Sequence, residues 1–383
     1  MRHRQRAVPR LATAVAAALL LYASPLGAQT PSEPAAPAVN VSGVIFGNYQ
    51  YHLGGQSKDF NQFLLDRAYV TVRASVSERT SIRVTSDVFQ SGDQNGWTIR
   101  AKYAYLQYDL WKRARWNTAL RAGMLHNVVV EHLEQFWPRF VSQVALERSG
   151  GFASADVGAA AVVTLPARVG EVYAHVVNGP GYTRREGDRF KDYAARLSLT
   201  PLAGRLSGPL STLTISPWIY EGAIASRFVR GGGGGIIAPV GEGLPRDRYG
   251  VVVGIRDPRL TGGIDIARMR TVTDTLGAGT TPTRVVTDAR ANVLAAFGVL
   301  RPLAFVHPSR RSRFGLIARY DDVESNTAAD DRYHFLIAGL LFDVNARSTI
   351  VLDYQEQLTN SGAPALPAPG SFRTLFAHVV VNF

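Results

Sequence analysis

Six arginines occupy positions from which their side chains could act together on a charged solute. Each lies on the polar side of a segment in which apolar and polar residues alternate: Arg67, Arg73, Arg83, Arg196, Arg313 and Arg319. A guanidinium group is permanently charged and donates several N–H groups, and basic side chains that line a passage favour the entry of anions. The alternative is that these arginines only neutralise nearby acids, which are Asp66, Asp87, Asp192 and Asp321.

A second charged group lies in the segment 128–151, "VVVEHLEQFWPRFVSQVALERSGG". Its charged residues are Glu131, Glu134, Arg139, Glu147 and Arg148. Apolar residues of the same segment, Phe136, Trp137, Phe140 and Val141, are suited to pack it against a wall and leave the charges free to face water. Long ordered connections tend to be functional, so this segment is predicted to form a constriction.

Catalytic and metal chemistry have weaker support. His126 and His132 lie near Glu131 and Glu134, but the four residues show no defined spacing of metal ligands. The sequence has neither an HExxH motif nor a GxSxG motif. The glycines at 231–235 are followed by no Lys-Ser/Thr pair and are expected to form a loop. We therefore predict no catalytic residue, no metal and no cofactor.

Strands are the elements expected to position these residues, because from Val41 onward nearly every segment alternates with a period of two. In 313–321, for example, Phe314 and Leu316 lie on one side while Arg319 and Asp321 lie on the other. About sixteen such segments can be counted, centred near residues 46, 69, 85, 104, 121, 161, 174, 195, 216, 252, 266, 292, 317, 338, 352 and 378. Long Gly/Pro-rich connections such as 178–188 contrast with short ones such as 344–349.

The start of the chain predicts export. Four arginines precede an apolar run over residues 11–23, and small residues follow it, as in a secretory signal peptide that ends at Ala28. The run is too short to span a bilayer as a helix. We expect residues 1–28 to be the signal peptide, residues 29–40 a flexible lead-in and residues 41–383 one β-domain.

The last residues, "LFAHVVVNF", alternate strictly and end on Phe383. This segment resembles the assembly signal of bacterial outer-membrane barrels, which implies recognition of Phe383 by the insertion machinery. In hydrocarbon every backbone N–H and C=O must be paired, so a β-protein spans a membrane only as a closed barrel. The predicted fold is therefore all-β, a transmembrane antiparallel barrel of about sixteen strands, with the aromatics Tyr103, Trp218 and Tyr220 among those expected at its interfaces.

The first half of the chain also resembles a known family. The segments "FLLDRAYVTVRASVSERTSIRVTSDVF", "AKYAYLQYDL" and "LRAGMLHNVVVEHLEQFWPRFVSQVALERSGGFASADVGAA" are similar to the phosphate-selective porin O/P family, over roughly residues 43–200 and the final strand. The resemblance implies a trimeric channel whose third external loop, here 128–151, folds inward. Unlike the phosphate-selecting members, this chain has no lysine in that loop.

Together these patterns predict an outer-membrane porin for passive diffusion of small hydrophilic solutes, favouring anions such as phosphate. The alternatives are a barrel plugged by its own loop, with a structural or adhesive role, and an outer-membrane hydrolase. Expected partners are outer-membrane lipids, the assembly machinery, small anionic or polar solutes and two further copies of the chain. Nucleic acid is not expected, because the basic residues are spread along the chain rather than clustered.

Overall fold

The computed structural model describes residues 38–54, 57–91, 96–112, 116–226, 229–230, 236–237, 242–276, 284–307, 312–329, 331–360 and 371–383. The expected signal peptide lies outside these residues, and the last part of the expected lead-in, residues 38–40, already belongs to the first strand. Within the described ranges, no helix combines the length and the apolar character needed to cross a membrane.

The described residues form sixteen strands of one antiparallel sheet. The strands of the first half are β1 (Ala38–His52), β2 (Asn61–Ser75), β3 (Thr80–Ser91), β4 (Gly96–Lys112), β5 (Asn117–His126), β6 (Ala155–Thr164), β7 (Gly170–Val177) and β8 (Asp192–Leu199). The next strand is interrupted at Gly222 into β9 (Thr214–Glu221) and β10 (Ala223–Ala225), and both parts pair with β13.

The second half continues the same sheet. Its strands are β13 (Gly243–Arg256), β14 (Leu260–Leu276), β15 (Arg284–Leu300), β16 (Phe314–Asn326), β17 (Asp331–Asp343), β18 (Ser348–Thr359) and β19 (Phe372–Asn382). A separate two-stranded ribbon joins β11 (Val229–Arg230) to β12 (Ile236–Ile237). The helical turns are α2 (Val130–Leu133), α3 (Ala145–Arg148), α4 (Leu303–Val306), η1 (Pro166–Arg168) and η2 (Pro209–Thr212).

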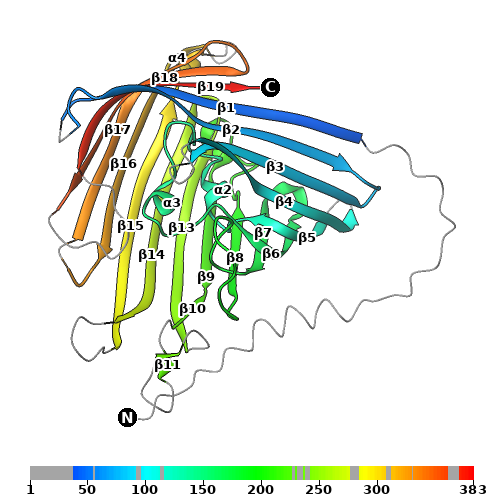
Figure 1. Cartoon of the computed structure of the whole chain (residues 1–383). Coiled ribbons are helices and arrows are strands. Elements are labelled where there is room, and N and C mark those ends of the chain that lie inside the picture. The colour runs from blue at the N-terminus through cyan, green and yellow to red at the C-terminus, as the bar shows by residue number, and fades with distance from the viewer. Residues whose placement is uncertain are drawn as a thin grey trace. The chain divides into compact units, whose positions relative to one another are not determined.

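The sheet closes on itself. Each strand pairs with the next along the chain, and β19 pairs with β1 over nine residue pairs from Val44↔Asn382 to His52↔Thr374. Figure 1 shows β19, in red, beside β1, in blue. Reciprocal backbone hydrogen bonds of 2.9 and 3.0 Å join Gly43 to Phe383 and complete the seam. Closure removes the exposed strand edges that would otherwise leave backbone groups unpaired.

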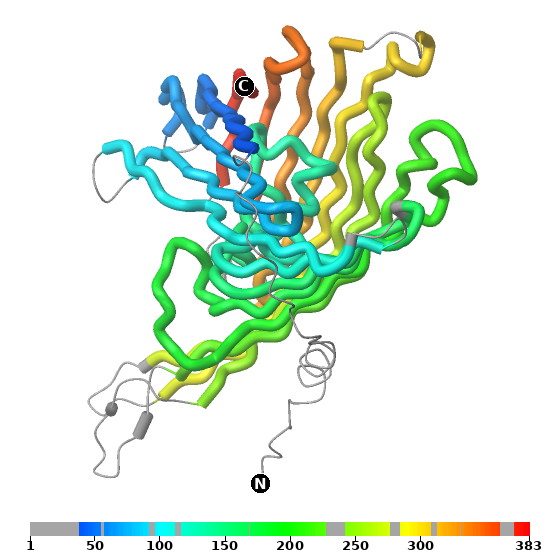
Figure 2. The backbone as a smooth tube through the Cα atoms, turned by 90° about the vertical axis from the view of Figure 1, so that its right-hand side faces the viewer, coloured from blue at the N-terminus to red at the C-terminus, as the bar shows by residue number. Residues whose placement is uncertain are grey.

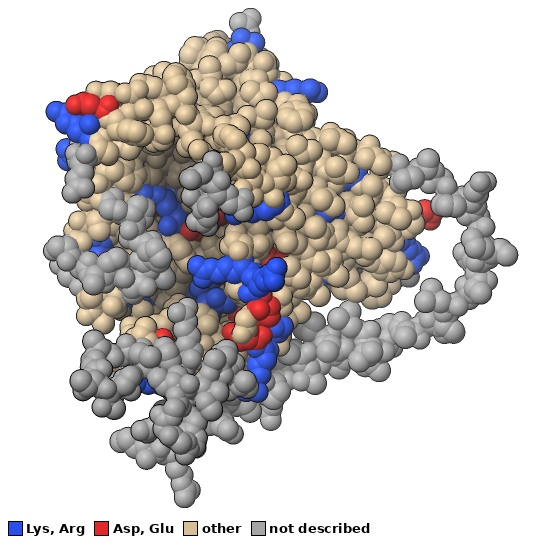
Figure 3. Space-filling model, in the orientation of Figure 1, with Lys and Arg blue, Asp and Glu red and all other residues tan. Residues whose placement is uncertain are grey.

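The predicted strands are confirmed, because each of the sixteen predicted centres lies inside one of the sixteen strands. Side chains alternate as expected. In β17 the outward Leu336 and Leu340 are exposed, whereas the inward Phe335 and Ile337 are buried. On the face shown in Figure 3 the wall beside the hollow is mostly uncharged, and lysine, arginine and acidic residues gather in and around the hollow.

Connections of different length lie at opposite ends of the barrel. The connection of residues 127–154, between β5 and β6, and that of residues 178–191, between β7 and β8, leave one end, whereas 76–79 and 344–347 turn at the other. The strands follow one another around the barrel in chain order, as Figure 2 shows, and neighbouring strands are antiparallel. Successive connections therefore lie at opposite ends of the barrel. The long and short connections that the sequence predicts therefore lie at different ends of the barrel.

Two expectations about side-chain direction were wrong. Tyr103, Trp218 and Tyr220, which we expected at the interfaces, point inward and are at most 4% exposed. Strict alternation along residues 63–74 puts Leu64 on the same side as the outward Val70, but its neighbour Phe63 is 86% exposed there instead. The cause is a β-bulge in which the register between β1 and β2 shifts at Phe46/Gly47 and leaves Asp66 unpaired in the ladder.

Candidate functional site

The candidate site is the inner loop, which we define as residues 127–154 between β5 and β6. It carries the turns α2 and α3 and includes the predicted constriction 128–151. Val128, Val129, Val130, Leu133 and Leu146 have no exposed surface. A loop that faced only solvent would leave such residues exposed, so this one packs within the barrel, where α2 and α3 appear in Figure 1.

Aromatic residues fix the inner loop against the wall. The ring of Phe136 lies against Gly254 of β13, where an added Cβ would lie 2.6 Å from two ring carbons. The ring centres of Trp137 and Phe297 of β15 are 5.9 Å apart in an edge-to-face arrangement, and those of Phe140 and Phe46 of β1 are 6.2 Å apart. The loop therefore touches strands that are far apart around the barrel.

The centre of the inner loop is held by an ion cluster. Arg139 lies between Glu134 and Glu147, and its Nη2 donates to Glu147 Oε1 over 3.0 Å. Burial by itself lowers the pKa of Arg139, but the two carboxylates outweigh it and raise this pKa well above its ordinary value. The three charged side chains of this cluster thus pair with one another and stabilise the conformation of the loop.

A second ion pair ties the loop to the wall near β3. The Nη1 of Arg83 donates to Glu131 Oε1 over 3.1 Å, and Glu131 Oε2 lies 2.8 Å from Nδ1 of His126. Burial alone raises the pKa of Glu131, but His126 and Arg83 outweigh it and lower this pKa to about 2. Glu131 therefore remains ionised at neutral pH. Its side chain is 32% exposed, which is more than the side chains of Glu134, Arg139 and Glu147, the other charged residues of the loop that form ion pairs.

Three further arginines join the inner loop to other strands. Arg319 of β16 pairs with Asp321 and donates to the carbonyl of Gln143. Arg196 of β8 pairs with Glu171 and donates to the carbonyl of Val128. Arg148 donates to Gln357 of β18 and lies 3.6 Å from the ring centre of Phe335. Burial lowers the pKa of Arg148 to about 10, so it stays charged at neutral pH.

The structure thus corrects the expectation that the five loop charges are free to face the lumen. Glu131, Glu134, Arg139 and Glu147 form ion pairs, and Arg148 is bound by an amide and aromatic rings. A polar segment that folds into a barrel loses water, so its charges must find partners there. Sequence alternation gives no information about such partners.

The six arginines fall into two classes. Four have ion-pair partners, of which two are acids named in advance: Arg67 lies 3.5 Å from Asp87, and Arg319 pairs with Asp321. Arg83 and Arg196 instead pair with Glu131 and Glu171. Arg73 and Arg313 are exposed and form no ion pair within the described part of the chain.

Some charged residues of the lumen escaped the sequence analysis. Lys102 is 3% exposed, and its Nζ lies 4.5 Å from the ring centre of Tyr69. It lies at a register shift between β3 and β4, so alternation along β4 does not predict which way its side chain points. Arg246 and Arg248 of β13 point inward. Their alternation with Asp247 and Tyr249 was a usable signal, although valines on both sides of this strand weaken it.

The residues considered for a metal site have separate partners. His126 contacts Glu131, His132 lies 2.8 Å from Ser216 Oγ, and Glu134 binds Arg139. Burial and the charge of Arg196 lower the pKa of His132 well below its ordinary value, so this ring is neutral at neutral pH. No cluster of three His, Cys, Asp or Glu side chains suited to a metal occurs in the described ranges.

Comparison with solved structures shows which fold this is. An anion-selective porin from Comamonas acidovorans aligns with a TM-score of 0.60 and 10% identity, over 91% of this chain and 100% of that one. The OmpT protein of Vibrio cholerae, in its trimer form, aligns with a TM-score of 0.60 and 11% identity, over 91% and 100%. OmpF of Salmonella typhi, solved with daunomycin, gives a TM-score of 0.55 and 10% identity, over 90% and 97%.

At this level of identity the likeness shows the fold alone. The described residues therefore form a closed sixteen-stranded barrel of the kind seen in outer-membrane porins. No protein-family model matches the sequence, and no curated protein matches it. The resemblance to the phosphate-selective porin O/P family is not confirmed by these comparisons and stays a prediction.

Proposed function

We propose that this chain is an outer-membrane porin through which small hydrophilic solutes diffuse passively, with a preference for anions. The observation that carries the proposal is the combination of a closed barrel, an apolar outer side and an inner loop fixed inside by ion pairs. A core that only had to be stable would need no charged interior. A charged lumen beneath an apolar outer surface is what a water-filled passage through a membrane requires.

The location in the outer membrane rests on the outer surface and on the sequence. Leu340 of β17 and Leu352 of β18 are directly paired, point outward and are 60% and 54% exposed. Such pairs suit contact with lipid, in which every backbone group must already be bonded within the sheet. The predicted signal peptide and the C-terminal strand ending on Phe383 agree with export and barrel assembly.

The preference for anions is supported by basic groups that lack acidic partners. Arg73 and Arg313 are exposed without an ion pair in the described part of the chain. The net charge of +12 includes four arginines of the predicted signal peptide, so about +8 remains after its removal, still an excess of cations. The Comamonas acidovorans protein that shares the fold is anion-selective. Phosphate remains the proposed physiological solute through the family resemblance. We propose a homotrimer because the Vibrio cholerae protein was solved as a trimer.

A second candidate is a barrel plugged by its inner loop. It is favoured by the loop's dense packing, since Leu133 and Leu146 have no exposed surface and Trp137 has 1%. A plug and a constriction differ in whether a continuous water path remains beside the loop. Neither candidate involves catalysis or a cofactor.

The test is the reversal potential of the purified, folded protein in a planar bilayer under a KCl gradient, repeated with phosphate added. Stepwise conductance with an anion-selective potential is the expected result, and block by added phosphate would support the phosphate preference. Conductance without ion preference would support a general porin and contradict the proposed preference for anions. Absence of conductance from folded protein would overturn the porin proposal in favour of the plugged barrel.

A further inference from the structure

A pocket of about 260 Å³ lies at the end of the barrel from which the long connections leave. It is bounded by the end of the inner loop at Phe152, by the connection of residues 178–191, and by β7 and β13. Its basic lining residues are His175, Arg184, Arg246 and Arg248. None of these was among the site residues predicted from the sequence.

Two basic side chains in this pocket are buried without partners. Arg248 is 7% exposed, its Nε has no hydrogen-bond partner, and it forms no ion pair within the described residues. Its guanidinium carbon lies 4.6 Å from the ring centre of Phe152 and 5.2 Å from that of Tyr220. His175 is 6% exposed, and its ring lies near the backbone of His126 without a well-formed hydrogen bond from either nitrogen. Buried polar groups are normally bonded, so these groups point to a missing ligand.

The neighbouring acids do not supply that partner. Asp156 accepts backbone N–H groups from Val157 and Gly179 over 2.7 Å and from Gly181 over 3.0 Å. Asp192 accepts from Arg246, from the Tyr220 hydroxyl and, over 3.2 Å, from the Ala223 N–H.

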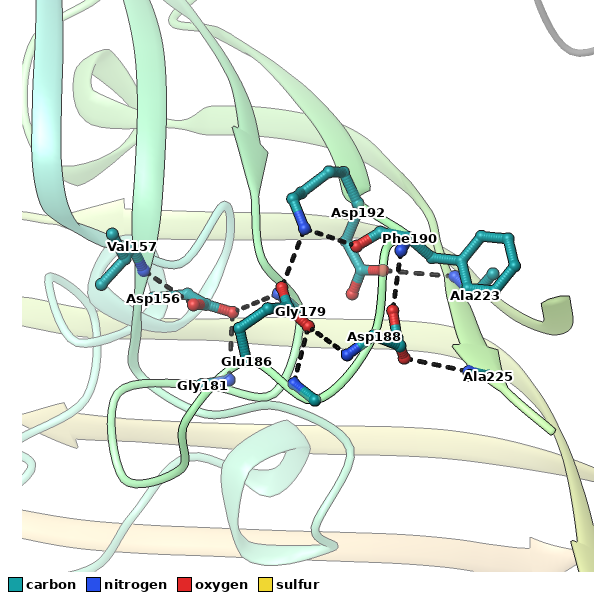
Figure 4. Close-up of polar contacts among 12 residues, drawn as sticks. Asp156, Val157, Gly179, Gly181, Glu186, Asp188, Phe190, Asp192, Ala223 and Ala225 are labelled. Carbon is teal, nitrogen blue, oxygen red and sulfur yellow. Dashed lines mark hydrogen bonds and ion pairs between the residues drawn. The ribbon is translucent and has the colours of Figure 1, made fainter. Parts of the chain in front are cut away.

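Figure 4 shows these two carboxylates turned toward the backbone at the rim of the barrel. Asp188 and Glu186 of the same connection likewise accept backbone N–H groups, from Phe190 and Ala225 and from Gly187 and Asp188. The acids thus hold the connection in place, and the pocket keeps the positive charges of Arg184 and Arg248 without ion-pair partners among the described residues.

We propose that this pocket binds one small oxyanion, such as inorganic phosphate or a short carboxylate. Arg248 would donate to it from the barrel wall and Arg184 from the connection above, with His175 as a further hydrogen-bonding group. Charge-assisted N–H···O bonds in a partly buried site are strong and suit the oxygens of such a ligand. The inference goes beyond the proposed function, because binding in this pocket requires no flow of ions.

The experiment is equilibrium dialysis of the full, folded chain against radiolabelled inorganic phosphate, with unlabelled phosphate or acetate as competitor. Saturable binding of one phosphate per chain is expected. Arg248→Gln should weaken it by roughly tenfold or more, as the loss of a charged hydrogen bond predicts. Competition by acetate would identify a general oxyanion site, and its absence would identify a site selective for phosphate.

The matched control is Arg270→Gln on the neighbouring strand β14, which removes the same charge from a half-exposed side chain paired with Asp288. It should leave phosphate binding unchanged. Arg184→Gln alters an exposed residue of the pocket and provides a second test should Arg248→Gln fail to fold. Lack of saturable binding, or equal binding by the Arg184, Arg248 and Arg270 variants, would overturn the proposal whatever the conductance measurements show.

Discussion

Arg139 sits between two carboxylates in the middle of the inner loop, and the side chains of Arg139, Glu134 and Glu147 are 11%, 16% and 9% exposed. Removing the positive charge leaves two buried acids that repel each other. Arg139→Gln should therefore destabilise the loop by about 3–5 kcal/mol, the usual cost of breaking a buried ion pair. Denaturant unfolding followed through tryptophan fluorescence, to which Trp137 of the loop contributes, measures this effect.

Arg185 provides the control for that variant, since it is an exposed arginine outside the cluster. Arg185→Gln should leave the unfolding midpoint unchanged. Adding Glu134→Gln and Glu147→Gln to the Arg139 variant should restore part of the stability, because no charge then stays unpaired. Equal midpoints for the Arg139 and Arg185 variants would show that the cluster contributes little.

Glu131 makes the attachment of the loop sensitive to acid. Its pKa is lowered from 4.5 to about 2 in the folded chain, so the folded state favours the ionised form. The stabilisation is complete above about pH 4.5 and is lost as the pH falls toward 2, because protonation breaks the pair with Arg83. Conductance and its noise should stay constant from neutral pH to about pH 3 and change as the pH falls toward 2, where Glu131 takes up its proton in the folded chain.

Glu131→Gln isolates this effect. The variant lacks the titrating group and should show altered noise at neutral pH, without the further change assigned to Glu131 at acid pH. A wild-type protein whose conductance is unchanged down to about pH 2 would contradict the assignment.

For single residues, the sequence predicts the side of the strand on which a side chain lies but not its partner. Alternation correctly placed Arg83, Arg196 and Arg319 on the inner side of their strands. It gave no partner for them, because Arg83 meets Glu131 from 48 positions away and Arg319 meets Gln143 from 176 positions away. Such contacts depend on where the inner loop lies within the barrel, which no local pattern records.

At the scale of the elements, the period-two pattern was sufficient to locate all sixteen strands, because each crosses from one end to the other with one apolar side. It failed where the ladder itself is irregular. The bulge at Asp66 reverses the sides of β2, so that Asp66 accepts a hydrogen bond from Asn48 on the inner side. The only sign of the bulge in the sequence is Asp66, a charged residue on an otherwise apolar side. Such residues are common in strands and do not by themselves indicate a bulge.

Gly254 shows how closely the inner loop packs on a strand. Since an added Cβ would lie 2.6 Å from the Phe136 ring, Gly254→Ala should push that ring away and cost about 1–3 kcal/mol, the usual penalty for overpacking. Loosening the segment around Phe136 from the wall should raise the rate of protease cleavage within the inner loop. The measurement is limited proteolysis of the folded protein in detergent.

Gly47 of β1 gives a matched control, because the nearest atom to an added Cβ there is 3.6 Å away, an ordinary contact. Gly47→Ala should leave the cleavage rate unchanged. A Gly254 variant that is cut no faster than the Gly47 variant would indicate that Phe136 can move without loosening the loop.

At the scale of the whole molecule, the sheet and the inner loop are held by different forces. The barrel is closed by strand pairing that includes β1 with β19, and β5 pairs directly with β6 through His126↔Ala155. The loop between them is held against the wall by aromatic contacts, by ion pairs and by hydrogen bonds from wall side chains such as Arg196 and Arg319 to its backbone carbonyls. The barrel should therefore persist without it.

Replacing residues 127–154 by Asn-Gly tests this separation, since that dipeptide forms the two-residue turn that a directly paired hairpin needs. The variant should still fold into a heat-resistant barrel, because the pairing of all sixteen strands is unchanged. Its single-channel conductance should be clearly higher than that of the wild type if the inner loop is a constriction. If the wild type is silent and the variant conducts, the loop is a plug, and equal conductance would show that the narrowest part of the passage lies elsewhere.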